Sequence, residues 1–278
     1  MEDRQLTGKG VGVAVLDTGI YPHMDFGNRI TGFYDFVSYQ KRPYDDNGHG
    51  THVAGILAGD GHASGGKYTG IAPGASIVAL KVLDRMGNGS RDTLLQAFLW
   101  LERHGREYGI RIVNISVGTT CSSKNQDDRL LNGVDALWDQ GLVVVAAAGN
   151  KGPCPGSITA PGCSKKIITV GSSDMINGKE AVSGRGPTFE CVFKPDIVAP
   201  GYRITSCSSG SAAGYGIKSG TSMSTPFVSG AIALLLEKYP EMTNREIKMR
   251  LKECADDMGL PKNQQGWGKF NRKRFLTI

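Results

Sequence analysis

Short apolar runs alternate with amphipathic stretches along most of the chain. Six runs of mostly apolar residues are typical of strands buried on both faces of a parallel sheet; they cover residues 11–16, 77–82, 112–115, 142–148, 167–170 and 197–199. Between these runs, apolar residues recur at helical spacing. The alternation of strands and helices, with no internal repeat or low-complexity break, predicts one α/β domain over residues 1–278 with a mainly parallel central sheet.

Capping signals mark the ends of several expected helices. One helix starts after Ser90 and closes at Gly109; its apolar stripe is Leu94, Leu95, Phe98, Leu101 and Tyr108. A second stripe lies within residues 130–138. Thr243 and Glu246 have the spacing of a capping box, which predicts the start of a final helix.

Composition narrows the class of protein. The chain has 278 residues, 40% of them hydrophobic, and a net charge of +6, with basic residues that are scattered rather than interleaved with aromatic ones. We therefore expect no nucleic-acid partner. The longest apolar run, 142–148, is strand-sized, so no membrane span is expected. Met1 to Arg4 is not followed by an apolar signal-peptide core, so no signal peptide is expected in this chain.

The cysteines do not form a recognisable metal-binding pattern. There are six, with no C-x-x-C pair: Cys121, Cys154, Cys163, Cys191, Cys207 and Cys254. Local spacing therefore gives no reason to expect zinc ligation. An even number permits disulfides, but a chain with this much core does not need them. Cys254 falls on the apolar face of the final helix and is expected in the core.

Polar residues follow two of the expected strands. Asp17 ends the run 11–16, and Asn150 follows the run 142–148. Ligands of open α/β sheets bind at the carboxyl ends of the strands. Asp and Asn are also common turn and cap residues, so their position alone leaves both interpretations open.

Two histidines lie in a stretch of small residues, 48–55. His49 and His52 are three residues apart, a spacing at which two side chains on a helix can share a metal ion. No third ligand stands at a recognisable spacing, and zinc proteases instead place their histidines four apart around a Glu. We therefore expect no metal at this pair.

Ser222 lies where a Gly/Ser-rich loop, 201–219, becomes an apolar helix that ends before Pro240. A serine here is usually an N-cap. It can also be a nucleophile if a base reaches it, because the N–H groups of a helix start favour developing negative charge. Pro226 is expected in or next to the first turn, where a missing N–H costs least.

Asp17, His49, Asn150 and Ser222 together supply an orienting carboxylate, a base, an amide donor and a nucleophile, which suffice for acyl transfer. Their surroundings, Asp17-Thr18-Gly19, 48–55 and 220–226, resemble the three active-site motifs of subtilisin-like serine proteases, in that family's Asp…His…Ser order. Residues 147–150 resemble the family's oxyanion segment. The resemblance covers nearly the whole chain.

The resemblance implies a three-layer subtilisin-like fold and a role for each residue. Ser222 matches the nucleophile, His49 the general base, Asp17 the carboxylate that orients the imidazole, and Asn150 an oxyanion-hole donor. Thr221 is expected to support the oxyanion site, and His52 to pack or bond to backbone. The expected activity is that of a serine endopeptidase acting on polypeptides through an acyl-enzyme.

Substrate-binding positions follow from the same resemblance. Ser116, Val117 and Gly118 match the segment that pairs with an extended substrate backbone, and Gly87, Asn88 and Gly89 match the facing edge. Ala148, Gly149 and Lys151 fall in one wall of the pocket for the residue before the cleaved bond; the segment 160–162 falls in the other, with Ala160-Pro161 expected to be cis.

Departures from the family pattern affect specificity. Lys151 stands where many relatives have Glu, so it either favours an acidic residue before the cleaved bond or is a solvated lysine without effect. Cys121, Cys154 and Cys163 lie near the expected pocket walls. A Cys154–Cys163 disulfide and free thiols both remain open.

The ends and one loop also depart from the pattern. Only sixteen residues precede Asp17, and loop 58–70 differs from the family's calcium loop. We expect no required cofactor, and a structural calcium ion is in doubt.

No prodomain is visible, although the resemblance allows an inhibitory propeptide as a partner. Short ends and segment 59–90 look closest to bacterial intracellular members, which favours the cytoplasm slightly over secretion after removal of a pre-pro segment.

Three rival functions differ in their sequence requirements. A non-catalytic binding module would have lost catalytic residues, whereas all four positions are filled. An α/β-hydrolase esterase would need a G-x-S-x-G elbow and a different order of triad residues. A nucleotide-binding protein would need a Walker loop or G-x-G-x-x-G, and neither occurs.

Overall fold

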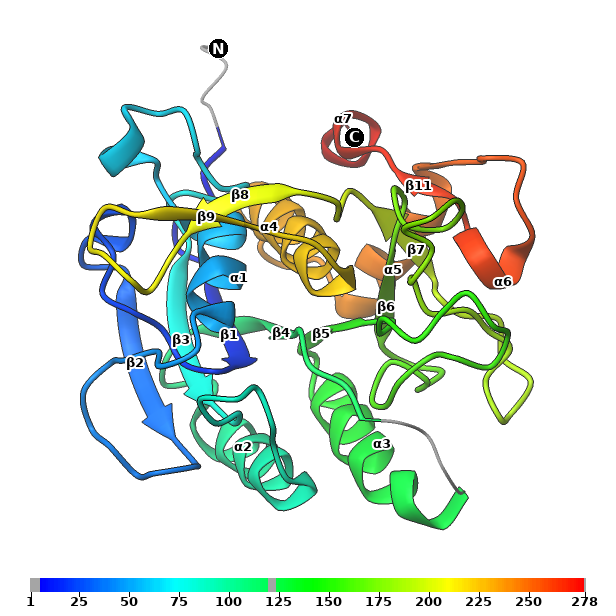
Figure 1. The fold of residues 1–278 in the computed structure, drawn as a ribbon, viewed down its shortest axis with the longest axis horizontal. Coiled ribbons are helices and arrows are strands. Elements are labelled where there is room, and N and C mark those ends of the chain that lie inside the picture. Colours follow the sequence, from blue (N-terminus) through cyan, green and yellow to red (C-terminus); the bar gives the residue numbers. More distant parts are fainter. Residues whose placement is uncertain (1–5, 120–123, 278) are drawn as a thin grey trace.

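The computed structural model describes residues 6–119 and 124–277, the side chains of residues 124–128 excepted. Within this part of the chain, nine strands form one sheet in the order β10-β11-β7-β6-β5-β4-β1-β3-β2 (Figure 1). They are β1 Gly12–Asp17, β2 Ile30–Asp35, β3 Ser76–Lys81, β4 Ile110–Ile115, β5 Val143–Ala147, β6 Ile168–Ser172, β7 Ile197–Ala199, β10 Ala255–Asp256 and β11 Lys269–Phe270. Neighbouring strands are parallel except for β10 and β11.

Helices cover both faces of this sheet. α1 (His49–Ala58) and α4 (Thr221–Lys238) lie on one face, and α2 (Arg91–His104) and α3 (Lys124–Asp139) lie on the other (Figure 1). The remaining helices are α5 Asn244–Glu253, α6 Lys262–Gln265 and α7 Arg272–Leu276, with short 3-10 turns η1 Met24–Phe26 and η2 His62–Ser64. The predicted three-layer α/β architecture is confirmed.

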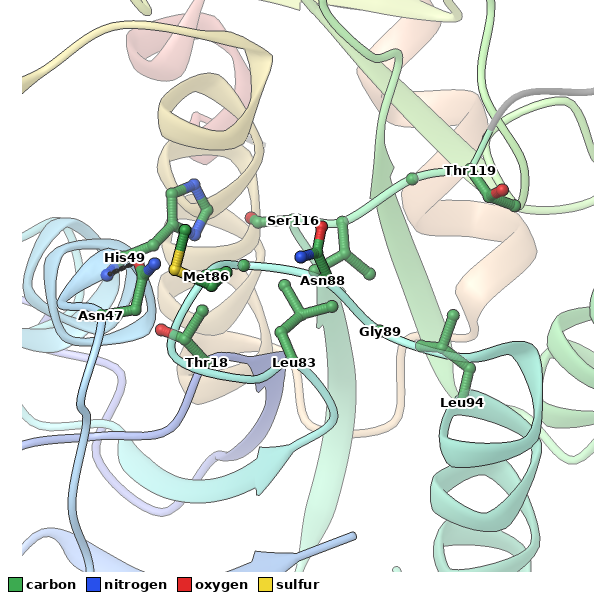
Figure 2. Close-up of a pocket in the computed structure, with 13 residues that line it drawn as sticks. Thr18, Asn47, His49, Leu83, Met86, Asn88, Gly89, Leu94, Ser116 and Thr119 are labelled. Atoms are coloured by element: carbon green, nitrogen blue, oxygen red, sulfur yellow. Dashed lines mark hydrogen bonds between the residues drawn. The ribbon is translucent and has the colours of Figure 1, made fainter. Parts of the chain in front are cut away.

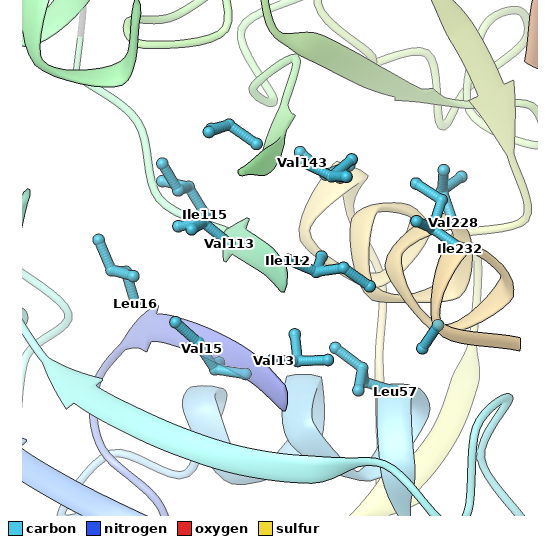
Figure 3. Close-up of a cluster of buried hydrophobic side chains, with 14 of the residues drawn as sticks. Val13, Val15, Leu16, Leu57, Ile112, Val113, Ile115, Val143, Val228 and Ile232 are labelled. Carbon is cyan, nitrogen blue, oxygen red and sulfur yellow. The ribbon is translucent and has the colours of Figure 1, made fainter. Parts of the chain in front are cut away.

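The core fills the space between the central strands and the helices. Every residue of β1 is buried, as expected for a strand covered on both faces. Val13 and Ile112 from adjacent strands pack near Leu57 of α1 and Val228 of α4, whereas Val15 lies further along β1 (Figure 3). This packing fixes the carboxyl end of β1 relative to α1 and α4.

Two helix predictions have different outcomes. The capping box of α5 forms as expected, because the Thr243 side chain accepts from Glu246 N and the Glu246 side chain accepts from Thr243 N. The extension of α2 to Tyr108 is wrong, since that helix ends at His104. Gly105 provides the carbonyl that accepts from Ile110 N, which turns the chain into β4 instead.

The Gly/Ser-rich stretch before α4 is not only a loop. It forms an antiparallel hairpin of β8 (Ile204–Cys207) and β9 (Tyr215–Lys218) that lies over α1 (Figure 1). The small residues of the hairpin hide its strand pattern in the sequence. The polar positions of the edge strand β2 hide that strand in the same way. Within the described residues, no helix has the length and apolar character needed to cross a membrane.

Candidate active site

Asp17 and His49 meet at the carboxyl end of β1. Asp17 is the last residue of β1 and is fully buried, and His49 is the first residue of α1. The two atoms His49 Nδ1 and Asp17 Oδ1 are 2.7 Å apart. Because a carboxylate can only accept, Nδ1 carries the proton and Nε2 is left as the basic nitrogen.

A second buried carboxylate, which sequence reasoning missed, holds these two residues together. Asp45 Oδ1 accepts from Thr18 Oγ1 at 2.8 Å and from Gly48 N at 2.7 Å, and Asp45 Oδ2 accepts from Thr51 N at 2.9 Å. Thr18 Oγ1 also accepts from Gly50 N. Asp45 thus satisfies free N–H groups at the start of α1 and ties that start to the residue after Asp17. In the sequence, the signal for this capping role was the position of Asp45 just before the Gly-rich start of a helix.

Ser222 lies in the first turn of α4, with Gly220 rather than a serine as the N-cap. Its hydroxyl donates to the carbonyl oxygen of Ser116 at 2.9 Å, and the Ser116 hydroxyl donates to the Ser222 carbonyl oxygen at 3.1 Å. Among the described residues, no hydrogen bond joins Ser222 to His49. A staggered rotation about the Cα–Cβ bond would turn Ser222 Oγ away from Ser116, and catalytic hydrogen bonds often form only with substrate.

Pro226 explains why Ser116 can bond to Ser222. It is the sixth residue of α4, next to its first turn as predicted, and it lacks the N–H that would normally bond to the Ser222 carbonyl. The Ser116 hydroxyl takes that place. Asn114 and Ser229, also missed from the sequence, extend the network, because Asn114 Nδ2 donates to Ser116 Oγ and Ser229 Oγ donates to Asn114 Oδ1.

Asn150 lies beside the start of α4. Its Oδ1 accepts from Thr221 N at 3.0 Å and from Thr221 Oγ1 at 3.2 Å, and Thr221 Oγ1 in turn accepts from Gly149 N. A Cβ atom added at Gly220 would lie 3.0 Å from Asn150 Nδ2. Thr221 therefore orients the Asn150 amide, whose Nδ2 group stays at the helix start as a donor.

A cleft of about 510 Å³ contains His49 and most of the predicted substrate-binding residues (Figure 2). The segment from Ser116 to Thr119 faces the loop that carries Met86 to Gly89. The cleft is lined by Thr18, Asn47, His49, Leu83, Met86, Gly87, Asn88, Gly89, Leu94, Ser116, Val117, Gly118 and Thr119. Such a cleft between two chain segments can accept an extended peptide.

The predicted residues Ala148, Gly149 and Lys151 do not line this cleft. Ala148 O accepts from Thr159 N, and Gly149 O accepts from Gly184 N, so both belong to a neighbouring wall. Lys151 is exposed. The Ala160-Pro161 peptide bond in that wall is cis, as predicted.

The pKa values of the two histidines of α1 are shifted in opposite directions. Burial acts to lower the pKa of His49, but the carboxylate of Asp17 outweighs it, so the His49 pKa lies above its ordinary value. Burial lowers the pKa of His52 to about 4. His52 Nε2 donates to the carbonyls of Ile204 and Gly216, which confirms the prediction that His52 bonds to backbone.

The thiols close to the site are not bridged. Cys154 is exposed and Cys163 is buried, and no disulfide joins them, so that alternative is not formed. Cys254 is buried, as expected. Cys121 lies outside the described residues.

Comparison with known proteins shows that the sequence of this chain is similar to those of proteases. Residues 8–268 match the subtilase family. Serine protease AprX of Bacillus subtilis (strain 168) is 42% identical over 275 residues, which cover 90% of this chain and 62% of AprX. Subtilisin Savinase of Lederbergia lenta is 38% identical over 269 residues, which cover 97% of this chain and 91% of Savinase.

Solved structures show the same fold. A cold adapted subtilisin-like serine proteinase superposes with a TM-score of 0.78 at 29% identity, covering 98% of this chain and 90% of that one. Sphericase superposes with a TM-score of 0.82 at 29% identity, covering 97% and 94%.

Proposed function

The chain belongs to the subtilase family, and we propose that it is a serine endopeptidase that cleaves polypeptides through an acyl-enzyme. One observation carries the proposal: His49 donates to the buried Asp17 carboxylate at 2.7 Å, in the same cleft as Ser116, whose carbonyl holds the Ser222 hydroxyl. The chain spans 62% of AprX, so this proposal concerns the activity of the part given by this sequence.

Each residue has one role in the proposed reaction. Ser222 Oγ attacks the scissile carbonyl, and His49 Nε2 takes its proton and later returns it to the leaving amine. Asp17 keeps the proton on Nδ1 and stabilises the imidazolium that forms. Asn150 Nδ2 and the Ser222 backbone N–H stabilise the oxyanion. Removing the oxyanion asparagine costs about 10²–10³ in kcat in subtilisin, and we take the same size for Asn150→Ala.

The proposed substrate is an extended or unfolded polypeptide of broad or moderately selective sequence. Its backbone would lie as an added strand between residues 116–118 and 87–89, and alternate side chains would enter the cleft. The apolar side chains of Leu83, Met86, Leu94 and Val117 support apolar residues on this side of the cleaved bond.

Labelling with a fluorophosphonate tests the mechanism directly. The parent protein should be labelled at Ser222, and Ser222→Ala should not. A parent that labels no better than Ser222→Ala would instead be a non-catalytic binding module. Hydrolysis of peptides rather than of simple esters alone separates a peptidase from an esterase.

Lys151 is the proposed specificity residue. It is exposed one residue after Asn150, where its charge would favour an acidic substrate residue just before the cleaved bond. Peptides with Glu or Phe at that position should be compared with the parent and with Lys151→Glu. Unchanged ratios of kcat/KM would mean that Lys151 is a solvated charge without effect.

We propose that catalysis needs no cofactor. Loop 59–70 closes through its own backbone, since Gly61 O accepts from both Ser64 N and Gly66 N, which supports a loop that needs no calcium. Activity that persists in a chelator selective for calcium would agree. An inhibitory propeptide stays a proposed partner.

The free, exposed thiols of Cys154 and Cys191 support the cytoplasm as the compartment, and fractionation of cells would test it.

A further inference from the structure

Three different metal-ligand side chains meet in a buried cluster outside the active site. His23 and Asp25 come from the η1 turn after β1, and Cys207 comes from the end of β8. Their exposed fractions are 2%, 0% and 1%. Within the described residues, this is the group whose His, Cys and carboxylate ligand atoms all lie within 4.8 Å of one another. The proposed peptidase mechanism uses none of them.

The three ligand groups lie close enough together to reach one ion after a rearrangement. His23 Nδ1 is 3.7 Å from Asp25 Oδ1, and Cys207 Sγ is 3.6 Å from Asp25 Oδ2. Zinc bonds of roughly 2.0–2.3 Å at tetrahedral angles place neighbouring ligand atoms about 3.4–3.6 Å apart. These two distances end on different oxygens of Asp25, so the carboxylate would have to turn until one oxygen faces both His23 Nδ1 and Cys207 Sγ. The three ligand atoms, which lie within 4.8 Å of one another, would then have to move closer together by up to about an ångström.

The hydrogen bonds of His23 leave its Nδ1 atom as the one that could bind an ion. His23 Nε2 donates to the carbonyl of Gly214 at 2.9 Å, and His23 Nδ1 accepts from Asp25 N at 3.1 Å, so the lone pair lies on Nδ1. A backbone carbonyl on the far nitrogen is the usual partner of a metal-bound histidine. An ion at Nδ1 would replace the bond from Asp25 N.

Charge also favours a cation. Ala63 N and the Tyr215 hydroxyl donate to the Asp25 carboxylate at 2.8 Å and 2.7 Å, but both donors are neutral. No lysine or arginine among the described residues forms an ion pair with this carboxylate. Buried charges are normally paired or bind metals. One divalent ion with the carboxylate, a thiolate and a neutral imidazole has no net charge, and the thiol proton leaves to solvent.

We propose that His23, Asp25 and Cys207 bind one zinc-class divalent cation, which joins the turn after β1 to the β8–β9 hairpin. The ion would be structural. The same hairpin contacts His52 of α1 and continues through Lys218 to the start of α4, so the ion would brace the elements that carry His49 and Ser222. No local spacing predicts this site, because Cys207 is 182 residues from Asp25 in the chain.

Cadmium, whose thiolate complexes absorb in the ultraviolet, is a direct probe. The test uses protein carrying Ser222→Ala, to stop self-digestion, with Cys121, Cys154 and Cys191 replaced by serine. In this parent we expect one Cd²⁺ per chain, a thiolate absorption band, its displacement by Zn²⁺, and a higher Tm with either ion. Cys207→Ser should abolish the band, and Cys254→Ser, which removes another buried thiol, should retain it.

His23→Asn keeps the proposal falsifiable if Cys207→Ser does not fold. Asn retains an oxygen that can accept from Asp25 N but lacks the imidazole, so Cd²⁺ should bind at least about tenfold more weakly. A parent that gives no band, a band that survives Cys207→Ser, or an affinity unchanged in His23→Asn would each overturn the proposal. None of these readouts depends on peptidase activity.

Discussion

Lys218 is one of several groups that act on the pKa of His49, after burial and the Asp17 carboxylate. Its positive charge acts to lower the pKa of His49, against the raising effect of Asp17. Only neutral imidazole can accept the serine proton, so kcat/KM should fall as pH drops through the raised His49 pKa.

Removing the Lys218 charge should therefore move this fall to higher pH. We expect Lys218→Met to shift the acid limb of kcat/KM upward by about 0.2–0.7 pH unit, since partly exposed charges interact by roughly 0.2–1 kcal/mol and about 1.4 kcal/mol corresponds to one pKa unit. Lys252→Met, on the exposed side of α5, should leave the profile in place. A downward shift in Lys218→Met would contradict the argument.

Asp45 acts on catalysis mainly by positioning the start of α1, and its charge also helps to raise the pKa of His49. Asp45→Asn keeps the shape of the side chain but replaces one accepting oxygen with a donor, which faces either the Thr18 and Gly48 donors or those of Thr51. We expect kcat to fall by about 10–100-fold with little change in KM, because small misplacements of catalytic groups have effects of this order. Steady-state kinetics on one peptide measures this.

An Asp139→Asn control tests the loss of a carboxylate away from the active site. Asp139 is an exposed partner of Lys166, and its loss should leave both kinetic constants unchanged. A rise in KM without loss of kcat in Asp45→Asn would place Asp45 in substrate binding instead.

At the scale of elements, a side-chain hydrogen bond joins α4 to the segment that follows β4, and this bond replaces a backbone donor that Pro226 lacks. Burial of an unpaired carbonyl costs about 1–3 kcal/mol. Pro226 cannot donate to the Ser222 carbonyl, so Ser116 Oγ does. The helix and the substrate-binding segment are therefore coupled by a side chain rather than by regular helix geometry.

A double-mutant cycle tests this coupling. In a Ser222→Ala background, Ser116→Ala should lower the free energy of unfolding by about 1–3 kcal/mol. In Pro226→Ala, the new N–H of residue 226 can bond to the residue 222 carbonyl, so adding Ser116→Ala should cost clearly less. Urea unfolding of the four proteins gives the coupling energy. Strictly additive losses would show that the Ser116 bond does not replace the missing helical donor.

For the whole molecule, the sequence predicted what is local and regular. The six apolar runs correspond to β1 and β3 to β7, because a strand buried on both faces needs continuous apolar residues. The motif residues Asp17 and His49 meet as proposed. What escaped prediction had different causes. Small residues hide the strands of the β8–β9 hairpin, and Asp45 lies in a polar stretch before α1 that shows no apolar pattern. The His23–Asp25–Cys207 cluster depends on a distant partner, because Cys207 is 182 residues from Asp25.

Acid stability should depend on His52, which joins α1 to the β8–β9 hairpin. Its pKa falls from 6.5 to about 4 on folding because its ring is buried. Between these values the unfolded chain binds the extra proton, so stability falls as pH falls, by roughly 3 kcal/mol in total. His52→Gln can still donate to Ile204 O or Gly216 O but does not titrate.

In the Ser222→Ala background, urea unfolding at about pH 7 and about pH 4 should therefore show a loss of stability that is roughly 3 kcal/mol smaller for His52→Gln than for its parent. The raised His49 pKa acts in the opposite direction but is present in both proteins. His104→Gln replaces an exposed histidine and should keep the full pH dependence of the parent. If His52→Gln loses as much stability as its parent, protonation of other groups controls the acid response, and folding does not lower the pKa of His52.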